Sequence, residues 1–357
     1  MSATLQTVAD AVGVSRSSVS NAYSRPDQLS PELRQRILDA AKRLGYAGPN
    51  PTARSLRRGR TGAVGVLVTA TLSSAFADPY AVRFLRGLAE SGERHGTGLL
   101  LLPLPLDDDE AAADLVRNAV VDGFCVYCVP DWHGSLDAIR TRGLPVVSAE
   151  LRHDGDHDTL CVGIDEAAAS RSAARHVALL GHRRVALLAT WSRPNQVDRR
   201  MTVPDLAAVP YYVTRERLRG YYEALSEVGV DAPDVTTVNA TENSRSEGAA
   251  AAGYALDRAP RPTAILAMSD LLALGALDAL AARGLRAGTD VSVVGFDDIP
   301  EAADAQLSTV RQPSIEKGRI AGGLLLDPPA DPHGRRIVLP TELVVRASTG
   351  PAPAGRT

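Results

Sequence analysis

The sequence predicts a small all-α N-terminal domain followed by an α/β body of two lobes, each built on a Rossmann-like parallel sheet. Residues 1–60 carry helix start and stop signals and hold 10 Lys and Arg against 4 Asp and Glu, whereas the remainder holds 29 basic and 38 acidic side chains. From Gly62 onward, short apolar runs alternate with amphipathic segments, as in βαβ units. Because about 290 residues are too many for one open sheet, we expect two lobes with a crevice between them.

The N-terminal domain has the residue types that a helix-turn-helix requires. Thr4 is placed to cap a first helix, and Ser15 is placed to cap a second helix that we expect from Arg16 to Tyr23. Gly13 lies between these helices, where the turn needs a left-handed backbone. The pattern therefore predicts two short helices joined by a tight turn.

A third helix is expected from Ser30 or Pro31 to Leu44, with Gly45 as its C-terminal stop. The apolar residues expected to form one small core are Leu5, Val8, Ala9, Val12, Val19, Leu33, Ile37, Ala41 and Leu44. The positive charge of this domain makes double-stranded DNA the first candidate partner, although charge alone is equally consistent with a solvated basic surface.

The segment after this domain predicts one more short helix. Asn50 is a capping residue, Pro51 suits a first helical position, and Leu56 is a single apolar side chain among several arginines. Such a helix is too short to be stable alone. We therefore expect it to need a partner, either DNA or the neighbouring domain.

The body is predicted to contain buried strands joined by amphipathic helices. The expected strands are 63–69, 98–102, 123–129, 145–148, 160–164, 184–189, 264–268 and 291–295. The expected helices are 80–94, 109–119, 166–180, 215–228, 246–256, 270–283 and 314–325. In such folds, ligands bind beyond the carboxyl ends of the strands, so the residues that follow each strand are the candidates for a binding site.

Taken together, the 4–21 pattern, the 46–60 segment, Gly181-His-Arg-Arg-Val185 and Val294-Gly-Phe-Asp-Asp298 closely resemble the LacI/GalR family of bacterial transcription regulators. The resemblance extends from Thr4 to Thr349 and implies a body like that of periplasmic sugar-binding proteins. It divides the chain into a helix-turn-helix domain (1–48), a hinge helix and linker (49–61), an effector-binding and dimerisation domain (62–349) and a disordered tail (350–357). Within 62–349, we expect one subdomain from 62–164 and 312–328 and the other from 165–310 and 330–349.

The resemblance assigns the DNA contacts. It directs Arg16, Ser17 and Asn21 toward base edges in the major groove, where arginine pairs with guanine and asparagine with adenine. Residues expected nearer the phosphates or at the helix start are Thr4, Ser15, Ser18 and Ser20. In the hinge, Leu56 is expected to enter the minor groove as an apolar wedge, accompanied by Ala53, Arg54 and Arg57. Many members have arginine at the Asn21 position, so the operator of this protein is expected to differ.

The resemblance also implies an effector site. Arg217 matches the effector-binding arginine, and Asp297 matches an acidic residue that accepts hydrogen bonds from effector hydroxyls or amides; we expect the two to lie opposite each other. Asn243 and Ser269 are further polar candidates, and Tyr80 is placed to stack on a sugar ring or a nucleobase, or to lie at a surface or subunit interface. Lower-weight candidates are Phe76, Asp78, Asp165, Trp191 and Phe296, of which Asp165 is more often a helix cap. The 191–212 insert is expected to be a lid or a flap.

Other function classes find little support. The sequence has no dinucleotide or phosphate-binding glycine motif and no nucleophile elbow, so we expect neither an enzyme nor a cofactor. The acidic and histidine-rich 153–158 segment favours a solvated turn over a metal site. Cys125, Cys128 and Cys161 are expected to be ordinary buried thiols, and His182 a structural hydrogen bonder.

The expected location is cytoplasmic and nucleoid-associated. Residues 1–10 contain no export signal, and no apolar run is long enough to span a membrane. This disfavours the alternative of a secreted solute-binding protein. Because no heptad pattern follows Thr349, we expect a homodimer. The resemblance favours a sugar or sugar derivative as the small-molecule effector and repression as the sign of control.

Overall fold

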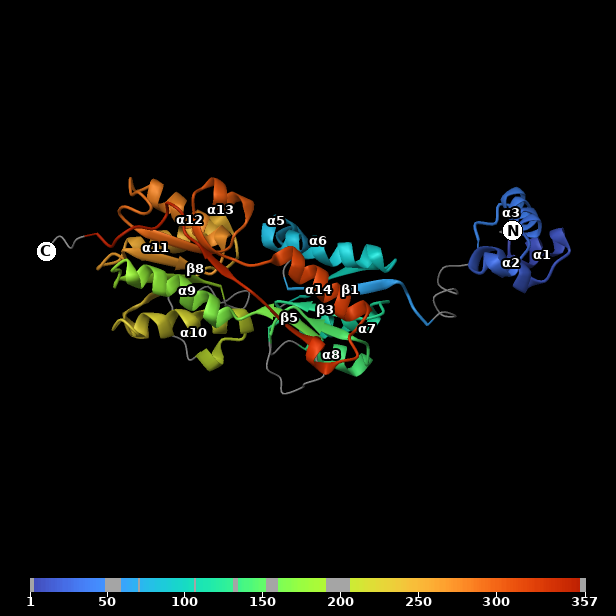
Figure 1. Cartoon of the computed structure of the whole chain (residues 1–357), viewed down its shortest axis with the longest axis horizontal. Coiled ribbons are helices and arrows are strands. Elements are labelled where there is room, and N and C mark those ends of the chain that lie inside the picture. The colour runs from blue at the N-terminus through green and yellow to red at the C-terminus, as the bar shows by residue number, and fades with distance from the viewer. Residues whose placement is uncertain are drawn as a thin grey trace. The chain divides into compact units, whose positions relative to one another are not determined.

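The computed structural model describes residues 3–48, 59–69, 71–105, 107–130, 134–151, 160–190 and 206–353. The chain forms two compact units, Met1–Gly62 and Ala63–Thr357 (Figure 1). Across these described segments, no helix is both long and apolar enough to cross a bilayer.

The first unit is a bundle of short helices whose ends are fixed by local hydrogen bonds. Its elements are α1 (Leu5–Val12), α2 (Arg16–Ser24), a 3₁₀ turn (Pro26–Gln28) and α3 (Pro31–Leu44). The hydroxyls of Thr4, Ser15 and Ser30 each accept the backbone N–H of the residue three positions on. Gly13 and Gly45 adopt left-handed backbones with φ of 75° and 69°. The predicted caps and turns of this unit are confirmed.

The core of the first unit is small and built largely of alanine and valine. Its fully buried members are Val8, Ala9, Val19, Ala22, Ile37, Ala40 and Ala41. Leu44 was expected in this core, but 44% of it is exposed. The chain reverses at Gly45, and Tyr46 packs against the core instead, with its ring edge-on to Tyr23. Tyr46 therefore takes the place in the core that was expected for Leu44.

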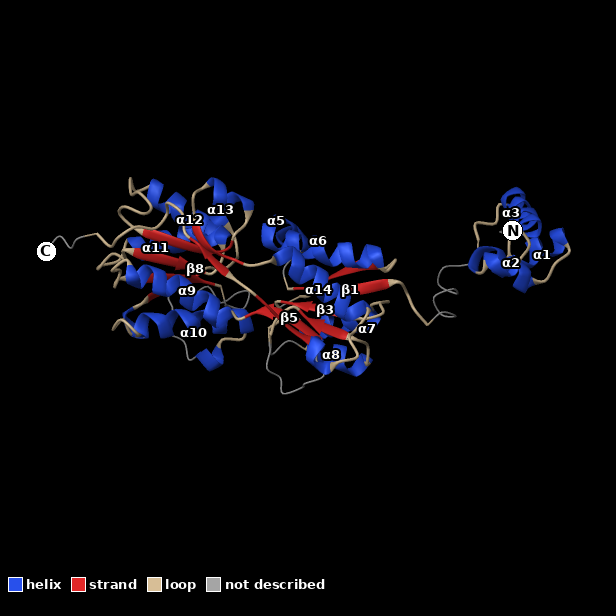
Figure 2. Cartoon of the chain, viewed as in Figure 1, coloured by secondary structure: helices blue, strands red, loops and turns tan. Residues whose placement is uncertain are grey.

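The described part of the body contains two six-stranded sheets (Figure 2). The first has the order β11-β5-β4-β3-β1-β2 and the second β12-β10-β9-β8-β6-β7. The first sheet consists of β1 (Ala63–Val68), β2 (Gly98–Pro103), β3 (Phe124–Tyr127), β4 (Val146–Ser148), β5 (Leu160–Ile164) and β11 (Arg336–Leu339). The second consists of β6 (Val185–Ala189), β7 (Thr236–Asn239), β8 (Ala264–Ala267), β9 (Ser292–Asp297), β10 (Ser308–Arg311) and β12 (Glu342–Val344). Neighbouring strands run parallel, except that β12 is antiparallel to β10. We call these sheets with their helices the first and second lobes.

Five of the described helices belong to each lobe of the body. Those of the first lobe are α5 (Leu72–Ala77), α6 (Pro79–Arg94), α7 (Asp109–Asn118), α8 (Ser135–Arg142) and α14 (Ser314–Leu326). Those of the second lobe are α9 (Glu166–Leu179), α10 (Tyr212–Ser226), α11 (Arg245–Leu256), α12 (Asp270–Ala281) and α13 (Pro300–Asp304). Short 3₁₀ turns lie at Leu206–Ala208, Ala232–Asp234 and Pro332–Arg335.

Glycines allow two helix pairs of the body to approach closely. A Cβ on Gly87 of α6 would lie 1.9 Å from the carbonyl oxygen of Ile315, and one on Gly318 of α14 would lie 2.0 Å from that of Phe84. In the second lobe, a Cβ on Gly220 of α10 would lie 2.2 Å from the carbonyl oxygen of Ala167. These contacts fix α14 against α6 and α10 against α9, and all four helices carry side chains of the site described below.

The strands and helices predicted for the body are present, but seven short ones were missed there. The missed elements are the strands β7, β10, β11 and β12 and the helices α5, α8 and α13. Strands β11 and β12 lie at sheet edges, where their side chains are exposed or half-buried, so they lack the continuous apolar run of a buried strand. Strands β7 and β10 contain mainly polar residues and threonine.

The expected boundary of the second lobe is wrong at the C-terminal segment. Residues 330–349 were assigned to that lobe, but β11 pairs in parallel with β5 in the first sheet, with Arg336 opposite Cys161. The chain then returns to the second sheet at β12, and the red segment in Figure 1 follows this path. Strand β11 supplies backbone partners to the edge of β5 that would otherwise be open.

Part of the segment that was expected to be disordered is hydrogen-bonded to the second lobe. Residues 350–357 were predicted to be disordered, yet the carbonyl oxygen of Gly350 is bonded to the buried imidazole of His182 at 3.0 Å, and Ala352 N–H donates to Leu180 at 2.8 Å. His182 also bonds the hydroxyls of Thr263 and Ser292 and is the structural hydrogen bonder that was predicted. Residues 354–357 lie outside the described residues.

Candidate functional site

Helix α2 of the first unit presents the predicted DNA-reading side chains. Arg16 and Ser17 are exposed, and Arg16 has no hydrogen-bond or ion-pair partner among the described residues. Ser15 accepts from the Ser18 backbone N–H at 3.1 Å, and its hydroxyl also bonds those of Ser17 and Ser18. The serines are thus tied to one another at the start of the helix, while the arginine remains available for another molecule.

Asn21 is partly engaged within its own unit. Its side-chain amide donates to Gln28 Oε1 at 3.1 Å, which leaves the amide oxygen as an acceptor. Ser20 is half-buried, and its carbonyl oxygen accepts from the Ser24 hydroxyl. The hinge candidates Ala53, Arg54, Leu56 and Arg57 lie outside the described residues, as do Trp191 and the 153–158 segment.

In the body, Arg217 of α10 is held by a buried ion pair. Its Nε donates to Glu166 Oε2 at 2.7 Å, and both side chains are less than one-tenth exposed. Its Nη1 donates to the carbonyl oxygen of Met268, and the guanidinium lies 3.6 Å from the centre of the Phe296 ring. Glu166 begins α9, so the close packing of α9 and α10 at Gly220 brings the two charges together. The ion-pair partner of Arg217 is thus Glu166, which the sequence did not indicate.

Asp297 remains close enough to Arg217 for their charges to interact. It ends β9 with φ of 120°, a strained value for a residue with a side chain, and it is buried. Its Oδ1 accepts from Gln312 Nε2 at 2.6 Å. Burial raises the pKa of the Asp297 carboxyl well above its usual value, Arg217 lowers it in part, and the nearby carboxyls of Asp270 and Asp78 raise it further. Strain and a perturbed pKa together favour a functional role for this residue.

A chain of hydrogen bonds joins the two lobes. Asp78 caps α6 by accepting Tyr80 N–H at 2.9 Å, and its second oxygen accepts from Asn243 Nδ2 at 3.2 Å. Asn243 precedes α11 of the second lobe, and its oxygen accepts from the Ser269 hydroxyl at 2.5 Å. Ser269 also caps α12. Asp78, Asn243 and Ser269, all of them predicted site residues, are therefore linked by hydrogen bonds to one another.

The first-lobe side of this region is aromatic. Tyr80 is buried, stacks on Tyr127 and accepts a hydrogen bond from Lys317 Nζ at 3.2 Å. Tyr127 stacks in turn on Phe84. Burial raises the pKa of Tyr80 to about 12, so this phenol is neutral at physiological pH.

Most of the predicted effector residues therefore meet between the lobes, whereas two do not. Phe76 lies on α5 with 59% of its surface exposed. Asp165 accepts a hydrogen bond from the Ala168 N–H and caps α9, the role that was considered more common for this position. We call the residues that share this region the interlobe polar cluster, which consists of Asp78, Tyr80, Glu166, Arg217, Asp297, Gln312 and Lys317.

Sequence reasoning missed Glu166, Gln312, Lys317 and Tyr127 as members of this region. Lys317 had a usable signal, because it is one of only two lysines in an arginine-rich chain. Gln312 directly follows β10, which was itself missed. Glu166 and Tyr127 carried no signal beyond their positions after or within strands.

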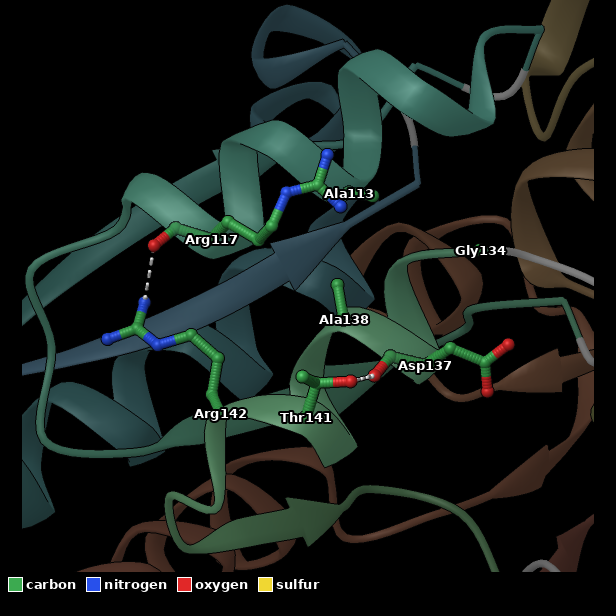
Figure 3. Close-up of a pocket in the computed structure, with 7 residues that line it drawn as sticks. All are labelled: Ala113, Arg117, Gly134, Asp137, Ala138, Thr141 and Arg142. Atoms are coloured by element: carbon green, nitrogen blue, oxygen red, sulfur yellow. Dashed lines mark hydrogen bonds between the residues drawn. The ribbon is translucent and has the colours of Figure 1, made fainter.

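Figure 3 shows a hollow of about 500 Å³ between α7 and α8, outside the interlobe polar cluster. Its lining residues are Ala113, Arg117, Gly134, Asp137, Ala138, Thr141 and Arg142. The Arg142 guanidinium donates to the carbonyl oxygens of Val116, Arg117 and Ala119, which end α7. These contacts give Arg142 a structural role.

The three thiols offer no sign of reactivity. Cys125 and Cys161 are buried and Cys128 is half-buried, and none forms a disulfide in the described structure. Burial raises the pKa of Cys125 to about 12 and that of Cys128 further, so both remain protonated at neutral pH.

Comparisons with known proteins cover nearly the whole chain. Residues 4–50 match the bacterial regulatory proteins of the lacI family, residues 61–204 the periplasmic binding proteins and sugar binding domain of the LacI family, and residues 174–349 a periplasmic binding protein-like domain. An HTH-type transcriptional regulator of Mycolicibacterium smegmatis is 43% identical over 98% of this chain and 97% of its own length.

Two solved structures share the fold. A LacI-family transcriptional regulator from Corynebacterium glutamicum has 35% identity and a TM-score of 0.73, with 98% of each chain covered. The regulator CelR in complex with cellobiose has 30% identity and a TM-score of 0.66, with 97% of this chain and 99% of that chain covered. The match at residues 4–50 disfavours a solute-binding protein without a role in transcription. The chain belongs to the LacI family of bacterial transcriptional regulators.

Proposed function

We propose that this regulator is a repressor whose affinity for operator DNA is controlled by a small polyhydroxylated molecule, a sugar or sugar derivative, bound between the lobes of its body. The observation that carries the effector site is the buried Arg217–Glu166 pair beside the strained, buried Asp297. Charged groups are costly to bury, and here they gather where the two lobes meet. The cellobiose complex of CelR supports a sugar as the ligand class.

The proposed DNA contacts follow the order of the chain. Arg16, Ser17 and Asn21 read base edges in the major groove, while Thr4, Ser15, Ser18 and Ser20 lie at or near the phosphates. Residues 49–61 form the hinge, in which Leu56 acts as a wedge with Ala53, Arg54 and Arg57 beside it. The free Arg16 guanidinium at the start of α2 supports this assignment.

We further propose a homodimer that acts in the cytoplasm at the nucleoid. Exposed apolar side chains in the first lobe support an interface: Phe76 is 59%, Val82 40% and Leu100 38% exposed. A symmetric pair of DNA-binding units would then bind the two halves of a pseudo-palindromic operator. Because the relatives are transcriptional regulators, we assign the interlobe polar cluster to binding, with no catalytic step and no cofactor.

The test is a selection of genomic DNA fragments by the purified full-length protein, followed by titration with sugars suggested by the neighbouring genes. The proposal predicts enrichment of one palindromic motif near sugar-uptake or glycosidase genes, and release of that DNA by one of the sugars. Absence of any enriched motif, with and without cell extract as a ligand source, would contradict it.

A further inference from the structure

Lys317 is a buried cation with a single neutral partner. It lies on α14 with 3% of its surface exposed, and its Nζ donates to the Tyr80 hydroxyl at 3.2 Å. Within the described residues it has no ion pair and no second hydrogen bond. An ammonium group has three N–H donors, so two of them are unused in a place where unpaired donors are costly. The close packing of α14 on α6 at Gly318 holds the group there.

The charge of Lys317 is retained despite burial. Burial alone would lower the pKa of this ammonium group, but the nearby Tyr80 and Glu166 more than compensate and leave its pKa above the usual value. Glu166 is already occupied, because it accepts the 2.7 Å hydrogen bond from Arg217. The cation therefore has free donors and no carboxylate of its own.

Two neighbouring groups also have unused hydrogen-bonding capacity, one as an acceptor and one as a donor. Gln312 directs its Nε2 to Asp297, and its buried Oε1 has no partner among the described residues. The Tyr80 hydroxyl accepts from Lys317, and its own proton has no acceptor in the same part of the structure. Gln312, directly after β10, thus supplies an unused acceptor, and Lys317 on α14 supplies unused donors.

We propose that Lys317 and Gln312 determine effector specificity by binding hydroxyl groups of an uncharged polyhydroxylated ring. Lys317 donates to hydroxyl oxygens, and Gln312 Oε1 accepts a hydroxyl proton. A hydroxyl group matches both needs because it is donor and acceptor at once. The inference rests on the proposed function and specifies the ligand of the same site.

The charge balance of the interlobe polar cluster favours a neutral ligand over a phosphorylated one. The cluster has two cations, Arg217 and Lys317, and three carboxyls, Asp78, Glu166 and Asp297. Arg217 is paired with Glu166. A phosphate group bound by Lys317 would be brought toward the carboxylate of Glu166, whose charge already acts on Lys317.

The test uses the full-length protein and the variants Lys317→Met and Lys317→Gln, with Arg86→Met as a control. Arg86 lies on α6 with 69% of its side chain exposed and is outside the cluster. The probes are neutral mono- and disaccharides, alditols and hexose monophosphates. Calorimetry measures their binding, and fluorescence anisotropy measures operator binding with and without them.

We expect the wild type to bind a neutral polyol, and Lys317→Met to weaken that binding by roughly 10- to 100-fold, the range for loss of a hydrogen bond to a charged group. Operator affinity without ligand should stay within about twofold, as should all properties of Arg86→Met. The thermal midpoint of ligand-free Lys317→Met is measured as a check on folding, because the variant loses the hydrogen bond between Lys317 and Tyr80. If Lys317→Met does not fold, Lys317→Gln provides the affinity comparison.

Unchanged polyol affinity in the Lys317 variants would overturn the inference, whatever the change in thermal midpoint. So would a wild type that binds hexose monophosphates in preference to neutral sugars, or one that binds operator but none of the neutral probes. Failure of the wild type to bind any DNA would instead overturn the proposed function.

Discussion

Helix α2 of the first unit and the interlobe polar cluster of the body hold their functional side chains in opposite ways. On α2, Arg16 is exposed and free, and the helix is positioned by its own cap at Ser15. In the body, Arg217 is buried and held by Glu166, Met268 and Phe296, which come from three other segments. A side chain that meets a large, charged partner at the surface needs little support, whereas one that meets a small ligand must be fixed in advance. The two regions should therefore respond differently to substitution.

The largest effect is expected at Arg217. Arg217→Ala leaves Glu166 buried without its partner, so the free energy of unfolding should fall by about 3–5 kcal/mol. The effector response should be lost, while operator binding below the unfolding temperature should persist. Chemical denaturation and operator titration measure the two effects. The double variant Arg217→Met/Glu166→Gln is the control, since it removes both charges and should recover part of the stability; a stable Arg217→Ala would contradict the role of the pair.

Arg16 should show the reverse pattern. Arg16→Ala removes an exposed side chain that forms no hydrogen bond or ion pair with the described residues, so stability should change by less than about 0.5 kcal/mol. Operator binding should weaken by about 1–3 kcal/mol, with reduced discrimination at one base pair. Anisotropy titrations with single-base operator variants test this. An equal loss on every DNA sequence would mean that Arg16 contacts phosphate rather than a base.

The helix packing that positions the interlobe polar cluster can be tested by substitutions that leave its charged residues unchanged. Gly220→Ala inserts a methyl group 2.2 Å from the carbonyl oxygen of Ala167, so α9 and α10 must separate, at a cost of about 1–3 kcal/mol in stability. Gly323→Ala in α14 is the matched control, because no atom lies within 4 Å of its added Cβ, and it should stabilise by up to about 1 kcal/mol. Thermal denaturation compares the pair. Equal effects at both positions would show that the close approach of α9 and α10 is dispensable.

The smallest effect is a pH dependence. Because burial raises the pKa of Asp297, the folded state retains a proton that the unfolded state releases above about pH 4. The contribution of this group is therefore largest in acid and decreases as the pH rises toward its pKa in the folded state. Asp297→Asn should flatten the stability profile in that range, as measured by denaturation from pH 4 to 8. A profile that keeps the wild-type slope would assign the dependence to another group, such as Asp270.

The same contrast explains what the sequence could and could not predict. Thr4, Gly13 and Ser15 act on backbone groups a few residues away, so their roles were readable from spacing alone. Arg217 and Asp297 were placed correctly between the lobes, but their partners Glu166 and Gln312 are distant in sequence and come from segments fixed by tertiary packing. The pairing of β11 with β5 was missed for the same reason. An edge strand with exposed side chains has no local sequence pattern that indicates which sheet it joins.

The most direct test measures whether operator binding by the first unit and effector binding between the lobes are coupled. Operator affinity is determined at increasing effector concentration, and effector affinity is determined with and without saturating operator, for the wild type and Arg217→Ala. In the wild type, each ligand should change the affinity for the other by the same factor, and this factor should become one in Arg217→Ala. A wild type whose operator affinity is unchanged by saturating effector would contradict this prediction.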